Sequence, residues 1–185
     1  MMKFGTMLYR FGTLAALALV LSMSARIVRA QSMDSEEISN LLAQAKSHAV
    51  LAEDDSATLE SFTRSKLSWE SFARKITVIR DHVNELGKLH GQLLELRPQG
   101  SPCQQRAIDQ IDPLVREMAD HLTAAINHLN DNQSKVHMPP FRDYVNANYE
   151  LASRTAALIR DFVAYDEASS KADSLEQQLE LPSDK

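Results

Sequence analysis

The sequence predicts an all-α protein, an antiparallel up-down-up-down four-helix bundle with a longer C-terminal helix. Apolar residues recur every three or four positions along four segments, which is the period of an amphipathic helix. Capping residues, Pro and Gly mark the ends of these segments, and the connections between them are short. No segment shows the two-residue alternation of a strand. Long helices with one apolar stripe and short connections bury those stripes by packing antiparallel.

Residues 1–30 precede these segments and resemble a secretory signal peptide. Lys3 and Arg10 form a positively charged start, and residues 11–23 form an uncharged, mostly apolar run of 13 residues. Such a run is typical of a signal peptide and is short for a helix that crosses a membrane. We therefore expect the protein to be exported and to be periplasmic or secreted.

Small residues at Val28 and Ala30 predict cleavage before Gln31. After cleavage, no membrane association is expected. Arg26 and Arg29, which follow the apolar run, are unusual in a cleaved signal and leave open the alternative that residues 1–30 stay as an N-terminal membrane anchor.

The charge balance argues against a nucleic-acid partner. The chain of 185 residues carries a formal charge of −5, but residues 1–30 hold four basic residues and no acidic one. The remaining chain thus has 16 basic and 25 acidic residues, a charge of −9. Proteins that bind nucleic acids need clustered positive charge to neutralise phosphates.

The first predicted helix spans about residues 35–64, with Asp34 as its N-cap and Glu37 completing a capping box. The acidic stretch 53–55 leaves open a break into two shorter helices. The second helix spans about residues 69–96 and begins after Ser68. Its apolar seam repeats every seven residues, as in a coiled coil; it comprises Phe72, Ile76, Ile79, Val83, Leu86, His90 and Leu93.

The third helix spans about residues 102–131. Ser101 and Gln104 suit a capping box, and the apolar repeat keeps its phase across Pro113, which predicts one kinked helix. The fourth helix spans about residues 139–180. We expect residues 31–166 to form the bundle. Residues 167–185 are more polar and predict a helical extension with a thin apolar stripe, Ala168, Ala172, Leu175 and Leu179.

Catalytic and cofactor motifs are absent from the sequence. It contains no Cys-x-x-Cys-His for covalent haem, no Glu-x-x-His for a di-iron site and no His-Glu-x-x-His for a zinc protease. It also lacks a Gly-rich phosphate loop and a Gly-x-Ser-x-Gly turn. We expect no enzyme activity, no catalytic residue and no bound cofactor.

Three histidines are nevertheless candidate ligands for haem or a metal ion. His90 lies on an apolar seam, and His121 and His128 are seven residues apart on one face of the third helix. If the hairpin turns at about residue 99, His90 faces Ile108 and His121 faces Thr77. This register predicts that no two histidines converge, so we favour a structural role for all three.

Cys103 is the only cysteine. It follows the predicted N-cap by two positions, where the helix dipole favours a thiolate. An unpaired cysteine in an exported chain suggests a reactive thiol or an intermolecular disulfide. The alternative is a small buried residue that packs at the end of the bundle.

Together these features predict an exported, non-catalytic helical bundle with a structural or protein-interaction role. Its C-terminal helix is the expected site of contact with a second copy or another protein. The alternative is a periplasmic four-helix bundle that binds haem or a metal ion, which rests on the histidines and on analogy between folds alone.

Overall fold

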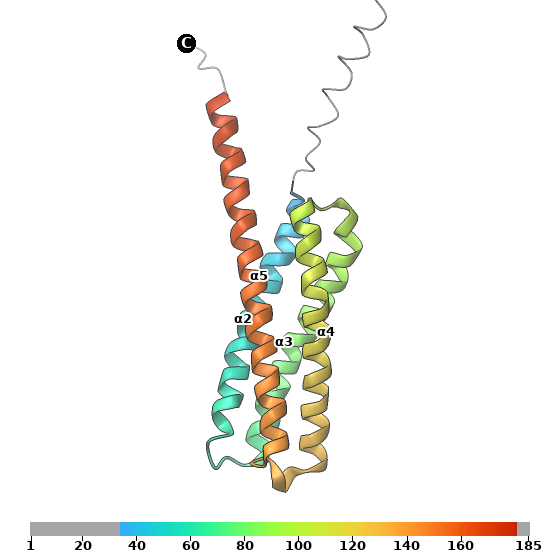
Figure 1. Cartoon of the computed structure of the whole chain (residues 1–185), viewed down its shortest axis with the longest axis vertical. Coiled ribbons are helices and arrows are strands. Elements are labelled where there is room, and N and C mark those ends of the chain that lie inside the picture. Colours follow the sequence, from blue (N-terminus) through green and yellow to red (C-terminus); the bar gives the residue numbers. More distant parts are fainter. Residues whose placement is uncertain (1–33, 181–185) are drawn as a thin grey trace, which may run out of the picture. The chain divides into compact units, whose positions relative to one another are not determined.

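The computed structural model describes residues 34–180 and confirms an all-α four-helix bundle (Figure 1). The four helices are α2 (Glu36–Phe62), α3 (Trp69–Leu96), α4 (Pro102–Asp131) and α5 (Pro139–Glu180), with the short 3₁₀ turns η2 (Arg97–Gln99) and η3 (Gln133–Lys135) between them. The predicted signal peptide lies outside the described residues. None of the helices within residues 34–180 contains an apolar stretch that is long enough to cross a membrane.

Each helix packs against two neighbours in a closed square. Helix α2 lies against α3 and α5, and α4 lies against the same two helices. Consecutive helices run in opposite directions, so the order along the chain is up-down-up-down (Figure 1). This arrangement lets each apolar stripe face the central axis, as short connections require.

The seven-residue apolar seams of α3 and α4 are buried, as predicted. In α3 the whole predicted seam is buried, from Phe72 to Leu93, and in α4 the seam is buried from Ile108 to Leu129. Aromatic rings fill the end of the core near the α2–α3 connection, where Phe72 packs edge-to-face against Phe62 and Phe141 with ring centroids 6.0 and 5.5 Å apart. Edge-to-face contacts of this kind add to the stabilisation from burial.

Helix α2 begins one residue later than predicted and is unbroken. Its N-cap is Ser35 and not Asp34, because the Ser35 hydroxyl accepts a hydrogen bond from the backbone N–H of Ile38. The acidic stretch 53–55 does not interrupt the helix. Two of its carboxylates, Glu53 and Asp55, instead contact neighbouring helices, since they receive hydrogen bonds from α5 and α3.

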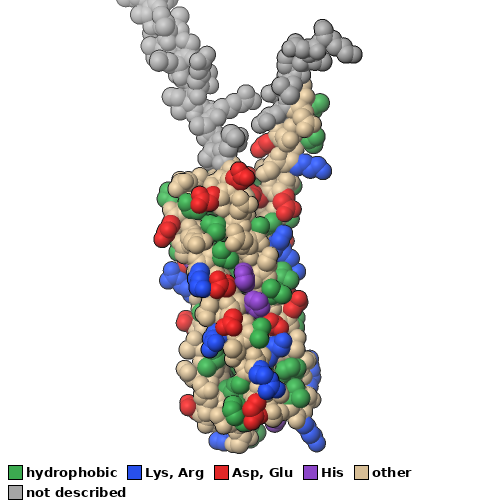
Figure 2. Space-filling model, turned by 180° about the vertical axis from the view of Figure 1, so that it is seen from behind, with side chains coloured by type: hydrophobic (Ala, Val, Ile, Leu, Met, Phe, Trp, Pro, Cys, Tyr) green, Lys and Arg blue, Asp and Glu red, His purple; other side chains and the backbone are tan. Residues whose placement is uncertain are grey.

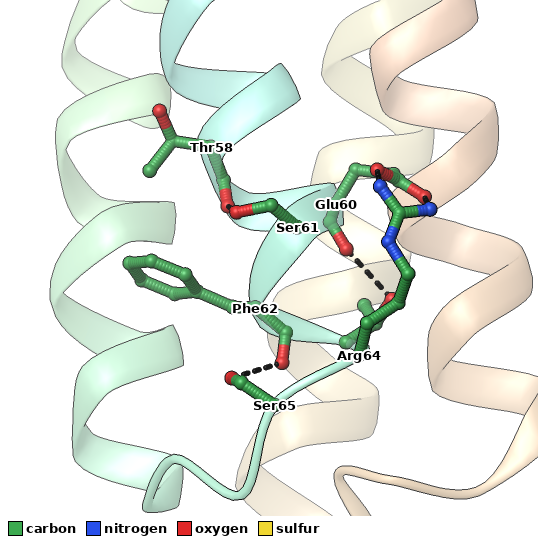
Figure 3. A network of polar contacts seen from close by, with 7 residues as sticks. Thr58, Glu60, Ser61, Phe62, Arg64 and Ser65 are labelled. Atoms are coloured by element: carbon green, nitrogen blue, oxygen red, sulfur yellow. Dashed lines mark hydrogen bonds and ion pairs between the residues drawn. The ribbon is translucent and has the colours of Figure 1, made fainter.

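Hydroxyl groups close the C-terminal end of α2 (Figure 3). Ser61, Thr63 and Ser65 donate hydrogen bonds to backbone carbonyls of the last turns, each at 2.7 Å. The guanidinium of Arg64 binds the carboxylate of Glu60 through both of its terminal nitrogens. The carbonyls of Glu60 and Phe62 also accept hydrogen bonds from the backbone N–H groups of Thr63 and Ser65, so the hydroxyls add a second donor to each.

Helix α4 shows the predicted capping box between Ser101 and Gln104. The Gln104 side chain is 1% exposed and also reaches across to α2. Its oxygen accepts from the backbone N–H groups of Ser35 and Ser101, and its nitrogen donates to the carbonyl of Ser35 and the hydroxyl of Ser39. One amide thus uses its full hydrogen-bonding capacity to join the first turns of two helices.

Two further features concern α4 and its connection to α3. The helix continues through Pro113, whose ring lies on the exposed side, so the helix is one element as predicted. Before it, Gly100 is buried at the point where α2 passes. A Cβ atom at Gly100 would lie 2.8 Å from Cδ1 of Ile38, so a side chain here would require the buried Ile38 side chain to move.

Replacing Gln104 with Ala should destabilise the bundle by about 2 kcal/mol, because two backbone N–H groups lose their buried acceptor. The change is measured as a lower midpoint of urea unfolding followed by circular dichroism. Gln105→Ala is the matched control, since the Gln105 side chain makes a single hydrogen bond, to the carbonyl of Gly100. Equal loss of stability in the two variants would contradict the role of the Gln104 network.

Candidate functional site

The last turns of α5 extend beyond the other three helices (Figure 1). Every side chain described between Lys171 and Leu179 is exposed. Leu175 is 49% exposed and Leu179 is 86% exposed, and Tyr165, near the end of the bundle, is 58% exposed. Large apolar side chains that protrude from a helix without a partner are typical of a surface that binds another protein.

These exposed residues form a regular stripe, which we call the α5 seam. It consists of Tyr165, Ala168, Ala172, Leu175 and Leu179, at alternating intervals of three and four residues. This is the spacing of the a and d positions of a coiled coil. The seam therefore has the geometry of one strand of a coiled coil whose partner is not part of the bundle.

Cys103 lies in the first turn of α4, beside the start of the α5 seam. It borders a shallow hollow of about 320 Å³ that Tyr165, Phe162 and Leu158 line from α5 and Arg106 lines from α4. The thiol is half-buried. Burial raises its pKa above the usual value, and the charges of Asp34 and Asp166 add to this effect, whereas Arg106 opposes it.

The direction of this shift is opposite to the one expected from the helix dipole, which would favour a thiolate. The carboxylates of Asp34 and Asp166 and the cover that α5 provides account for the difference. Cys103 is therefore a mostly protonated, partly accessible thiol at neutral pH. No disulfide involves it within the described chain.

His90 is a buried side chain between α3 and α4 and is 6% exposed. Its Nε2 lies 3.4 Å from a carboxylate oxygen of Asp112, without the geometry of a hydrogen bond. Burial lowers the pKa of His90, and the charge of Asp112 partly opposes this effect. His90 therefore faces Asp112 rather than Ile108, one turn further along α4 than the predicted register placed it.

The other two candidate ligands occupy separate positions on α4. The ring of His128 stacks on Phe141 at a centroid distance of 6.0 Å and also packs near Tyr144, at 5.6 Å. Its Nε2 is buried without a hydrogen-bond partner. His121 is half-buried one seven-residue repeat earlier. Among residues 34–180, no group of three or more His, Cys, Asp or Glu side chains is arranged to hold a metal ion.

Two other histidines do come together, contrary to the predicted absence of convergence. His48 of α2 and His82 of α3 approach with their Nδ1 atoms 3.3 Å apart. Figure 2 shows histidine side chains in contact about half-way along one face of the bundle. The prediction considered only the hairpin between α3 and α4. Applied to the α2–α3 connection, the same reasoning would have found the pair, because both residues lie 17 positions from residue 65.

The buried position of His90 predicts a loss of stability in acid. Because burial lowers its pKa, the unfolded chain binds a proton more readily than the folded one. The contribution of His90 to the free energy of unfolding is therefore fully present above pH 6.5, the ordinary pKa of histidine. It decreases as the pH falls below that value. Urea unfolding at about pH 7.5 and about pH 5.5 should show a smaller acid loss in His90→Gln than in the original protein.

His137→Gln is the control for this measurement, because the His137 side chain is exposed. This variant should lose as much stability in acid as the original protein does. A His90→Gln variant with an unchanged loss would show that His90 does not contribute to the pH dependence.

Comparisons with known proteins do not place this chain in a family. No family model matches it, and no curated protein or solved structure gives a significant match.

Proposed function

We propose that this protein is an exported, non-catalytic helical bundle that assembles with a second copy of itself through the α5 seam. The observation that carries the proposal is the exposure of Leu175 and Leu179 on a helix that continues past the bundle. An isolated helical segment of this length gains little stability in water by itself. Burial of the seam against a partner helix would supply that stability.

The sequence of the seam favours a second copy as the partner. The a and d positions of the seam are apolar in every described turn, and two of them are Ala, which allows close approach of two helices. A parallel pair of identical helices brings the same a and d positions of the two copies together, so the seam would pack against itself.

Export is proposed from residues 1–30, which have the pattern of a signal peptide. The periplasm or the extracellular space is then the proposed location. Intact-mass measurement of the protein from the exported fraction should give a chain that begins at Gln31. A mass that includes residues 1–30 would instead support the N-terminal anchor.

Changing Leu175 and Leu179 together to Ser should convert a dimer into a monomer, because the apolar part of the seam is lost. Sedimentation equilibrium over a wide range of protein concentration measures the mass. Leu94→Ser is the matched control, since Leu94 is a 39% exposed leucine on α3, away from the seam. It should leave the mass unchanged. A monomeric original protein at every concentration would overturn self-association.

Removal of residues 171–185 should leave the bundle folded, because every side chain described from Lys171 onwards is exposed and contributes little to the core. Thermal unfolding followed by circular dichroism should give the same midpoint as the Leu175→Ser, Leu179→Ser double variant, since both lack the seam. A much lower midpoint for the truncated chain would mean that the extension is part of the folded core.

A further inference from the structure

The pair of His48 and His82 joins the middle of α2 to the middle of α3. The two rings are tilted by 49° with their centroids 5.6 Å apart, and their Nδ1 atoms are 3.3 Å apart. Both side chains are half-buried, so solvent reaches the pair while the neighbouring core residues hold the helices in place. A ring nitrogen carries either a proton or a lone pair, so two facing nitrogens share one proton or bind one common ion.

A carboxylate lies next to one of the two rings, without the geometry of a hydrogen bond. Oδ2 of Asp55 lies 3.5 Å from Nε2 of His82, and Oδ1 of Asp55 accepts a hydrogen bond of 2.7 Å from Lys75. Asp55 favours a proton on the Nε2 that faces it, which leaves the lone pair of His82 on Nδ1. That lone pair is directed towards His48. A carboxylate behind a histidine is the usual outer partner of a metal-binding imidazole.

The separation of the two Nδ1 atoms matches a tetrahedral metal site. Zinc binds histidine nitrogens at about 2.0–2.1 Å, and two ligands at the tetrahedral angle are then about 3.3–3.4 Å apart. We infer that His48 and His82 bind one divalent transition-metal ion of the zinc type through their Nδ1 atoms, with Asp55 orienting His82. Water molecules complete the coordination, since only two protein ligands converge.

The donor set defines which ions fit. Imidazole nitrogens suit zinc, copper and nickel, whereas magnesium and calcium require oxygen ligands. Glu85 lies one turn after His82 on α3, and its carboxylate is bonded to Lys88 at 2.6 Å. It supplies negative charge next to the pair. Binding would cross-link α2 and α3 and would stabilise the folded chain in proportion to the free ion concentration.

The test uses the exported protein, purified without a histidine tag and freed of metal with a chelator. Calorimetric titration with zinc chloride should show one site in the original protein. His48→Gln and His82→Gln should each weaken binding at least tenfold, because a single imidazole remains. Asp55→Asn should weaken it about tenfold, the usual effect of losing an outer partner. Magnesium chloride should give no binding.

His121→Gln is the matched control, because His121 is half-buried like the pair but lies on α4. It should bind zinc as the original protein does. A second measurement, the rise of the thermal midpoint on adding zinc, should be lost in the His48 and His82 variants while their circular dichroism stays helical. Equal zinc affinity in the original protein and the His48→Gln, His82→Gln double variant would overturn the site. This outcome is independent of whether the chain forms dimers.

Discussion

The register between α2 and α3 is the constraint on which the polar chemistry of this bundle depends. A short connection, residues 63–68, joins two helices whose apolar seams must both face the core, so the helices have little freedom to slide. His48 with His82, and Asp55 with Lys75, lie at equal sequence distances from the middle of that connection and meet across the helix pair. Sliding α3 by one turn would separate both polar pairs.

Local sequence signals were sufficient for most of the fold. The bounds of three helices agree with the seven-residue apolar pattern and its flanking Ser and Pro residues, and the capping box at Ser101 appears as expected. Only α2 differs, because it begins one residue later and ends two residues earlier than predicted. Asp34 and Ser35 are both good N-caps, and the choice between them depends on Gln104, which is 69 residues away from Ser35 in sequence and binds its backbone.

The positions of side chains relative to other helices were harder to predict. The helix bounds on both sides of the α3–α4 connection are as predicted, yet His90 lies next to Asp112, so counting residues from the middle of the connection does not give the offset between the two helices. The pKa of Cys103 follows from burial and from carboxylates that other helices contribute. Both depend on how other parts of the chain pack against α3 and α4, so a pattern within one segment does not determine them.

Helix α2 differs from α3 and α4 in what it buries. Ala45, Ala49, Ala52 and Ser56 occupy four successive core positions, where α3 and α4 place mainly branched side chains. Small side chains remove little apolar surface from water, so the middle of α2 gains less from burial and relies on polar contacts at its edges. The backbone amide hydrogens of α2 should therefore exchange with solvent by local opening that costs less free energy than in α3 and α4.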